Sequence, residues 1–185
     1  PAIARKRRNT VHPVAQDIAL HLAQNAHGRC AMAYWACGDD GGDIEPIGIL
    51  SIEELKAFDL VGPENWGGGT KMTPIIQYFW EQVFVDVKSQ GVAAIVTDGA
   101  WDDDDHEQLL QLTQVMCDAI ASGQRPLMKC VILGLETEAN KAETEKIEDR
   151  FNDLDDFESN TDIDVWDHKW VHELRDYNQI FIEMV

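Results

Sequence analysis

The sequence contains no run of about 18 consecutive apolar residues, the length that a helix needs to cross a bilayer, so we expect no membrane-spanning helix. It also lacks a charged segment followed by an apolar one at its start, and we therefore expect no secretory signal peptide. Cysteine is scarce: the chain has 4, and none forms a C-x-x-C pair, which argues against a zinc ribbon or a redox motif. Because the neighbours of these cysteines are apolar, we expect reduced, buried thiols in a cytoplasmic protein.

Basic residues are also few: the chain has 15 Lys and Arg against 34 Asp and Glu, a net charge of −19. Four basic residues at positions 5–8 precede the first acid, Asp17, so the rest of the chain has 11 basic and 34 acidic residues and a charge of −23. A surface that acidic repels phosphate backbones, which argues against nucleic-acid binding. The basic tetrad predicts a solvated tail or a contact with a phosphate or an acidic partner.

The length of 185 residues and the hydrophobic content of 44% suit one globular domain with a core of its own. We predict that residues 13–185 form this domain. Residues 1–12 are predicted to be a basic N-terminal tail or the remnant of an upstream segment. Because the sequence opens with Pro1, we expect a processed chain, a trimmed one, or a piece of something longer.

Apolar runs alternate with segments of helical periodicity along the chain. The first two strands, separated by a Gly- and Asp-rich turn, predict a hairpin. The later strands are separated by helices, which predicts parallel pairing and an α/β doubly wound, mostly parallel sheet with helices on both faces. We predict helices over 13–26, from Ser51 to near Leu60, over 73–89, 103–122, 138–151 and 168–184, and strands over 29–37, 44–50, 92–96, 127–133 and 163–166.

Ligands of such sheets bind beyond the carboxyl ends of the strands, so the loops that leave the strands are the places to look for a site. Two segments are informative together. Residues 66–74, Trp-Gly-Gly-Gly-Thr-Lys-Met-Thr-Pro, lead into a helix, and residues 94–99, Ala-Ile-Val-Thr-Asp-Gly, end a strand about 25 residues later. With the order of the predicted elements, these segments resemble the von Willebrand factor A family over essentially the whole chain.

The resemblance implies a Rossmann-like sheet that binds a partner protein at its carboxyl edge, with one divalent cation, Mg²⁺ or Mn²⁺, held by three loops. In that family the first loop carries D-x-S-x-S, the second a threonine and the third an aspartate. The threonine maps onto Thr70 and the aspartate onto Asp98. Hard cations prefer such oxygen ligands, and an open position on the ion accepts a carboxylate from the partner.

The sequence departs from the family at the first of these loops, because it contains no D-x-S-x-S. The helix at 13–26 matches the helix that should follow this motif, but residues 1–4 are too short and weakly apolar to form the central strand before it. Without that strand, its two neighbours would leave ladder groups unpaired. Three explanations stay open: an upstream strand is missing from the chain, a partner or second copy donates one, or the site is degenerate and the domain has rearranged.

Aromatic and acidic residues near these loops are candidates for partner binding. Trp66 and Trp101 lie in the two candidate loops, where they could rim a binding surface, although core packing is the default for tryptophan. Asp102 opens a run of four acids whose simplest role is to cap the helix that follows. Beside Asp98, these acids would also make the sheet edge attractive to cations or to a basic partner.

Catalytic motifs are not found. The segment 67–71 fails the G-x-x-x-x-G-K-[ST] pattern of a phosphate loop, and no serine lies in G-x-S-x-G. His168 and His172 are four residues apart, but the Glu of H-E-x-x-H is replaced by Lys169, so structural roles are favoured. We therefore predict an interaction protein and not an enzyme. The alternatives are an accessory or adaptor subunit of an AAA+ ATPase system and a hydrolase on a doubly wound sheet.

Overall fold

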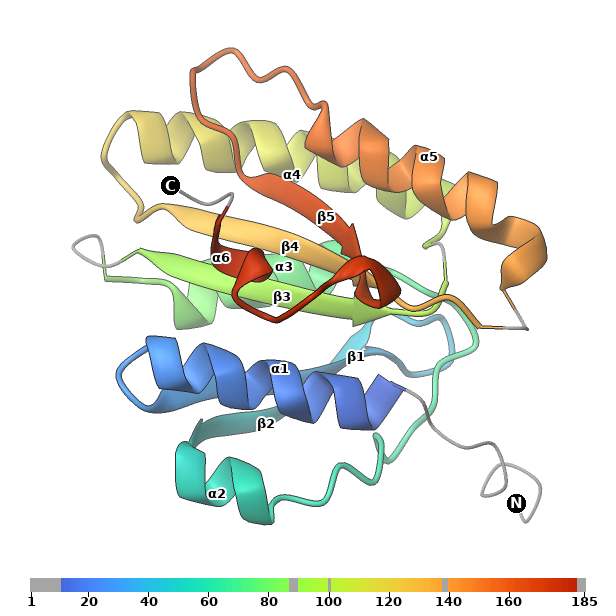
Figure 1. Cartoon of the computed structure of the whole chain (residues 1–185). Helices are drawn as coiled ribbons and strands as arrows, with labels where there is room; N and C mark the ends of the chain where they lie inside the picture. The colour runs from blue at the N-terminus through green and yellow to red at the C-terminus, as the bar shows by residue number, and fades with distance from the viewer. Residues whose placement is uncertain (1–10, 87–89, 100, 138–139, 183–185) are drawn as a thin grey trace.

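The computed structural model describes residues 11–86, 90–99, 101–137 and 140–182. These residues form a mixed α/β fold whose strands make two separate sheets (Figure 1). The predicted hairpin is confirmed, but the described strands do not form the single continuous sheet that was expected. The hairpin consists of β1 (Arg29–Cys37) and β2 (Asp43–Ser51), and the parallel sheet has the order β3 (Gly91–Thr97), β4 (Met128–Gly134), β5 (Trp166–Trp170).

The helices pack around these two sheets, and in the described part of the chain none has the length and apolarity that crossing a bilayer requires. They are α1 (Val11–Asn25), α2 (Ile52–Ala57), α3 (Thr73–Tyr78), α4 (Asp103–Ala121), α5 (Thr144–Asp155) and α6 (Gln179–Ile182), with a π-helical turn η2 (Phe79–Val83) and the 3-10 turns η3 (Lys141–Glu143) and η4 (Val171–Glu173).

Helix α1 bridges the two sheets on one side of the molecule. Ile18 and Leu22 pack against Val131 and Leu133 of β4, together with half-buried residues of β3. Residues 19 and 23, both alanines one position further round the helix, pack instead toward α2 and the hairpin. The small alanines let α1 approach the hairpin closely, so one helix covers parts of both sheets.

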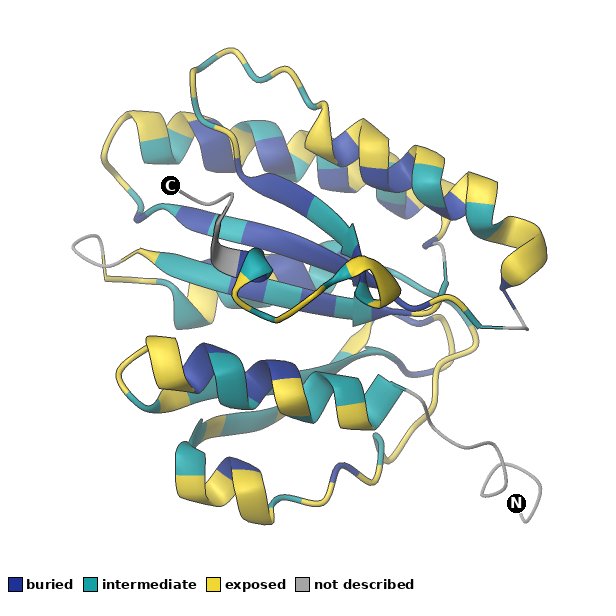
Figure 2. Cartoon of the chain, viewed as in Figure 1, coloured by how far each residue is buried: buried dark blue, intermediate teal, exposed yellow. Residues whose placement is uncertain are grey.

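The opposite side of the parallel sheet carries the larger core. Side chains from α3, α4 and α5 pack there against alternate residues of the strands, for example Ala93 and Ile95 of β3 and Ile132 of β4. Figure 2 shows this buried centre under α4 and α5. Helices therefore contact both faces of the parallel sheet, as the helix-separated apolar strands predicted.

The predicted helix over 73–89 is shorter and irregular. After α3 the chain makes the π-helical turn η2, in which the Phe84 amide donates to the Phe79 carbonyl (2.8 Å), and the helix ends there. The Phe84 ring then lies against Gly91, where a Cβ atom would come within 1.8 Å of it. The apolar residues of the sequence continue with helical spacing beyond this point, so the end of the helix could not be predicted from them. Residues 87–89 of the predicted helix lie outside the described part.

The predicted C-terminal strand is confirmed in type but displaced, whereas most of the helix predicted after it is wrong. The strand was expected at 163–166 and a helix at 168–184, whereas β5 spans Trp166–Trp170 and α6 is the one α-helix beyond η4 in the described residues. Positions 183–184 of the predicted helix lie outside the described part. Trp166 and Trp170 are both buried and four residues apart. A spacing of four fits the helical repeat of 3.6 and is also twice the strand repeat of 2, so periodicity alone could not separate the two.

Candidate functional site

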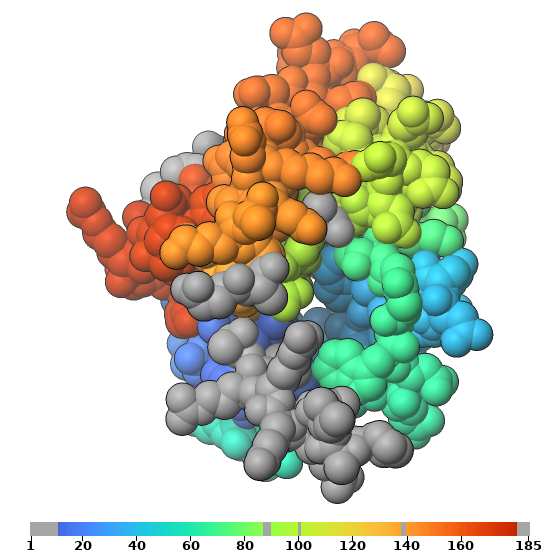
Figure 3. All heavy atoms as spheres, turned by 90° about the vertical axis from the view of Figure 1, so that its right-hand side faces the viewer, coloured from blue at the N-terminus to red at the C-terminus, as the bar shows by residue number. Residues whose placement is uncertain are grey.

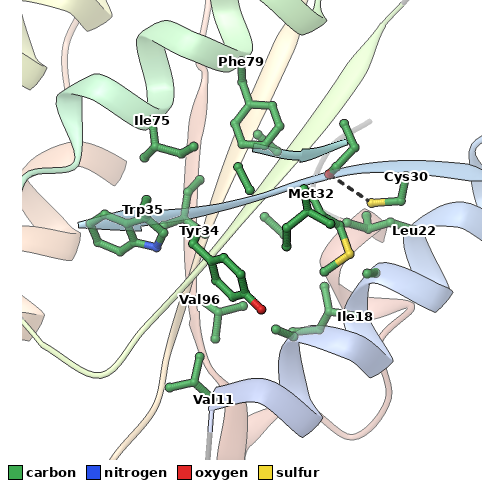
Figure 4. Close-up of a pocket in the computed structure, with 18 of the residues that line it drawn as sticks. Val11, Ile18, Leu22, Cys30, Met32, Tyr34, Trp35, Ile75, Phe79 and Val96 are labelled. Atoms are coloured by element: carbon green, nitrogen blue, oxygen red, sulfur yellow. Dashed lines mark hydrogen bonds between the residues drawn. The ribbon is translucent and has the colours of Figure 1, made fainter. Parts of the chain in front are cut away.

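A cavity of about 1410 Å³ lies between β1 and β3 (Figure 4). Consecutive residues of both strands, 29–36 and 92–99, line it. Side chains of consecutive strand residues point to opposite faces, so a cavity that touches all of them lies at the strand edges, between the two sheets. Ile18 and Leu22 of α1 line one side of it, and Ile75 and Phe79 line the other. The volume exceeds the range of about 300–1,000 Å³ that is usual for small-ligand pockets.

The β3 edge that faces this cavity is unpaired in the described residues. The Gly91 amide donates to Leu127 O (2.9 Å) and the Leu135 amide donates to Thr97 O (2.8 Å), so odd-numbered residues of β3 bond to β4. In a parallel ladder the alternate residues direct their N–H and C=O groups to the other edge. These alternate residues are Val92, Ala94 and Val96.

The backbone groups of β1 that face the cavity can be identified in the same way. The Ile52 amide donates to Gly28 O (3.2 Å), which places the backbone groups of Cys30 and Met32 toward β2 and those of Ala31 toward the cavity. The Ala31 carbonyl accepts a hydrogen bond from the Cys30 thiol (3.4 Å), a weak donor, drawn dashed in Figure 4. At the carboxyl end of β1 this edge is paired, because Cys37 forms an antiparallel bridge with Trp66. A backbone group that is buried without a partner costs about 1–3 kcal/mol, so the open part of the two edges is costly wherever it is shielded from water.

Burial along β1 reflects the open edge. The strand was expected to be covered on both faces, but Cys37 is the one buried residue among its nine. Apolar side chains such as Met32 and Trp35 are half-buried instead, because the cavity adjoins them. The Cys30 thiol still lies in apolar surroundings, and burial raises its pKa to about 11.

At the carboxyl end of β1, two glycine-rich loops are closely packed together. A Cβ atom on Gly67 would come within 2.0 Å of the Ala36 carbonyl oxygen, and one on Gly69 within 2.6 Å of the Asp40 carbonyl oxygen. The Lys71 ammonium pairs with Asp40 at 2.8 Å, and this hydrogen bond lowers the pKa of the Asp40 carboxyl. The glycines therefore allow backbone-to-backbone contact between the two loops.

Thr70 and Asp98 both line the cavity, at the end where β3 stops. The Thr70 carbonyl accepts a hydrogen bond from the Asp102 amide (2.9 Å), and the Asp98 carbonyl accepts one from the Asn140 side chain (2.6 Å). The Asp98 side chain is exposed and Thr70 is half-buried. Both residues predicted to hold a cation are thus held by their backbones at the same end of one cavity.

The acidic run after Asp98 is mostly structural. Asp105 is buried and accepts hydrogen bonds from the Met72 and Thr73 amides (2.6 and 3.2 Å to one oxygen), so it caps α3 and not its own helix. Asp103 pairs with the guanidinium of Arg150. Asp102 is exposed at the start of α4, as expected for a helix cap position, but its side chain makes no capping hydrogen bond.

The two candidate tryptophans differ. Trp66 is 65% exposed, and its ring covers Gly62, where a Cβ atom would come within 2.5 Å of it. Trp101 is 1% exposed and does not rim a surface: its ring stacks on Phe151, and its indole N–H donates to His106 Nδ1 (3.1 Å). The expectation of a surface role for Trp101 is therefore corrected by its burial in the core.

Two structurally important positions beside the candidate site were not predicted. Asn140 donates from its amide to the carbonyls of Asp98 and Leu135, and so ties the loop after β3 to the loop after β4. Asp105 ties α4 to the start of α3. A signal existed for Asp105, which lies four residues before Leu109 on the apolar face of its helix. Nothing in the sequence marked Asn140.

Metal ligands do not gather in the residues described. Among them, no group of three or more His, Cys, Asp and Glu side chains could hold an ion together. The predicted pair His168 and His172 is not on one helix face, since the first is in β5 and the second in η4. His168 Nδ1 lies 3.2 Å from Asp155; burial raises the pKa of Asp155, and the nearby His168 opposes this.

Comparison of the chain with protein-family models, with curated proteins and with solved structures returned no match. The resemblance to the von Willebrand factor A family therefore depends on the motifs and the order of elements alone.

Proposed function

We propose that this chain is a protein-recognition module that binds a partner at the carboxyl-end rim, defined as residues 38–42, 61–72 and 97–99. The observation that carries the proposal is the large apolar cavity, together with the exposed apolar side chains beside it. Of the five large hydrophobic residues that are exposed in the described part of the chain, three line the cavity: Ile49, Val61 and Trp66. Val61 and Trp66 lie on the same loop at the rim, and neighbouring exposed apolar side chains mark interaction sites more often than isolated ones do.

The shape and the charge of this end of the molecule support the same proposal. Figure 3 looks onto the end where β3 stops and shows an opening between the chain there and the loop of residues 61–72. Asp98 and Asp102 are exposed near this opening. With a net charge of −19, the chain attracts a partner with a basic segment, which speeds association and favours that partner over acidic ones.

The divalent cation and the von Willebrand factor A architecture belong to the same proposal. Thr70 and Asp98 offer two oxygen ligands at one end of the cavity. Mg²⁺ commonly retains several waters and takes one or two carboxylates, so these two residues fit a weakly held hydrated ion better than a cage of protein ligands. The ion would supply an open position for a carboxylate of the partner.

The recognition surface can be tested with a phage-displayed library of random linear peptides selected on the immobilised chain. The selected peptides should bind W66A at least tenfold more weakly than the wild type, because Trp66 supplies exposed aromatic area at the rim. The matched control is V115A, since Val115 is also exposed (59%) but lies on α4 and does not line the cavity. Failure to select any peptide, or equal binding to both variants, would contradict recognition at the rim.

A thermal melt tests the cation. At ten times its dissociation constant, Mg²⁺ or Mn²⁺ should stabilise the chain by about 1.4 kcal/mol, which raises the melting temperature by about 3–6 °C. D98A should remove this rise, whereas D162A, at an exposed acid away from the cavity, should keep it. No rise in the wild type would remove the cation from the proposal and leave peptide recognition standing.

A further inference from the structure

The cavity has two strand edges as walls, and this limits what can fill it. Val92, Ala94 and Val96 direct N–H and C=O groups into it from β3, and Ala31 does the same from β1. An apolar small molecule could cover the surrounding side chains but would offer no backbone partner to either edge. A polypeptide strand satisfies both rows at once, because its own groups point alternately to its two edges.

We propose that an extended segment of a partner polypeptide inserts between β1 and β3 and joins the two sheets into one. This inference rests on the proposed function, because it names how the partner is bound. Strand addition to an exposed edge is a common mode of peptide recognition, and here two facing edges would be filled by one strand.

The surroundings define the chemistry of the inserted segment. Ile18 and Leu22 cover one face of the cavity, and Ile75 and Phe79 cover the other. A strand covered on both faces is apolar along its whole length, and it contains no proline in its middle because both edges need its amides. To match the seven residues of β3 it must extend over about 23 Å.

The flank of the segment is expected to be basic. Where β3 ends, the cavity opens beside Asp98, and Asp102 follows close by, with its amide bonded to Thr70. Lys71, the nearest cation in the loop, already pairs with Asp40. A lysine or arginine next to the apolar segment would therefore meet the carboxylates of Asp98 and Asp102 as it leaves the cavity.

The reactivity of the native Cys30 thiol can show whether the cavity is occupied, so no label has to be introduced by mutation. It lines the cavity and is half-buried, while the other three cysteines, Cys37, Cys117 and Cys130, are buried. A bound strand would cover its thiol. Alkylation by iodoacetamide at mildly alkaline pH, followed by mass spectrometry of the modified peptide, therefore measures whether the cavity is open.

Proline variants separate strand insertion from binding at the rim. Ala94→Pro removes an amide that faces the cavity and leaves the β3–β4 ladder intact, which an edge strand tolerates. Ala31→Pro does the same on β1 and serves as a second variant if the first melts at a much lower temperature. Neither position contributes to the exposed apolar surface near Trp66.

The experiment uses random linear peptides of about 12 residues, selected on the full chain, which is long enough for the strand and its flanks. Insertion predicts that the selected peptides are apolar with a basic flank, slow Cys30 alkylation at least tenfold, and bind A94P or A31P at least tenfold more weakly than the wild type. Free chain whose Cys30 is already as unreactive as Cys130 would overturn the proposal, because the cavity would then be filled by the chain itself.

The remaining outcomes distinguish the two proposals. Peptides that lose affinity for W66A but not for the proline variants, and that leave Cys30 reactive, would overturn insertion while rim recognition stands. Peptides that bind all variants equally, or no selected peptide at all, would overturn both.

Discussion

The side-chain amide of Asn140 donates to the Asp98 carbonyl at 2.6 Å, and so holds the end of β3 in place from the loop after β4. The same amide donates to the Leu135 carbonyl at 2.8 Å, and its oxygen accepts from the Thr137 amide at 2.7 Å. Asn140 is buried, so these bonds replace water at three backbone groups. The position of Asp98 at the cavity therefore depends on a residue 42 positions away in the sequence.

Replacement of Asn140 should destabilise the chain. N140A leaves buried carbonyl groups without a donor and should lower the free energy of unfolding by about 1–3 kcal/mol in urea titrations. N140D should cost at least as much near neutral pH, because a carboxylate would face two carbonyl oxygens. An unchanged midpoint in both variants would show that the two loops are not held by this side chain.

Asp105 should matter more to stability than its acidic neighbour Asp104. D105A removes the acceptor for the Met72 and Thr73 amides at the start of α3 and should cost about 1–3 kcal/mol. Asp104 is exposed, so D104A should change the free energy of unfolding by no more than about 0.5 kcal/mol. Denaturant titration of the two variants compares them directly, and equal effects would contradict the assigned role of Asp105.

A pair of glycine variants tests the contact between the two loops at the rim. G67A would place a Cβ atom 2.0 Å from the Ala36 carbonyl, and such crowding should cost about 1–3 kcal/mol. At Gly99 nothing lies within 4 Å of an added Cβ atom, so G99A should be neutral to within about 0.5 kcal/mol. If the two variants melt at the same temperature, the loops are not in contact as described.

Cys30 should alkylate slowly in the native chain. With a pKa of about 11, it carries about 300-fold less thiolate at neutral pH than a free cysteine whose pKa is about 8.5. The rate should therefore continue to rise with pH above 9, whereas the urea-unfolded chain should level off earlier. The C30S variant lacks this thiol, so the alkylation that it loses is the alkylation of Cys30. A native rate that levels off near the ordinary cysteine pKa would contradict the apolar surroundings of this thiol.

Several elements could be predicted from the sequence because local signals and burial agree there. The strand at 29–37 has the predicted bounds, and α4 ends one residue from its predicted end at 122. The helix predicted from Ser51 begins there, because the Ser51 hydroxyl accepts from the Glu54 amide and the Glu54 carboxylate accepts from the Ser51 amide. These features depend on residues that are close in the sequence, so they can be predicted without a structure.

The features that could not be predicted depend on contacts between residues that are distant in the sequence. The apolar composition of β1 predicted a buried strand, but it cannot say which segment lies beside that strand. No strand pairs with β1 on the side of β3 in the described residues, where only Cys37 forms a bridge, with Trp66. Trp101 looked accessible because its loop is polar, yet Phe151 of α5 stacks on it. The hydrogen bonds of Asp105 and Asn140 likewise join segments that are distant in the sequence. Asp105 bonds to Met72, 33 residues away, and Asn140 bonds to Asp98, 42 residues away.

Amide hydrogen exchange along β3 tests the open edge most directly. In the free chain, the amides of Val92, Ala94 and Val96 should exchange much faster than those of Ala93 and Ile95, which bond to β4. Residue-resolved exchange by NMR would show this as an alternation with a period of two. Uniform protection of all five amides would mean that the edge is already paired and would contradict the account.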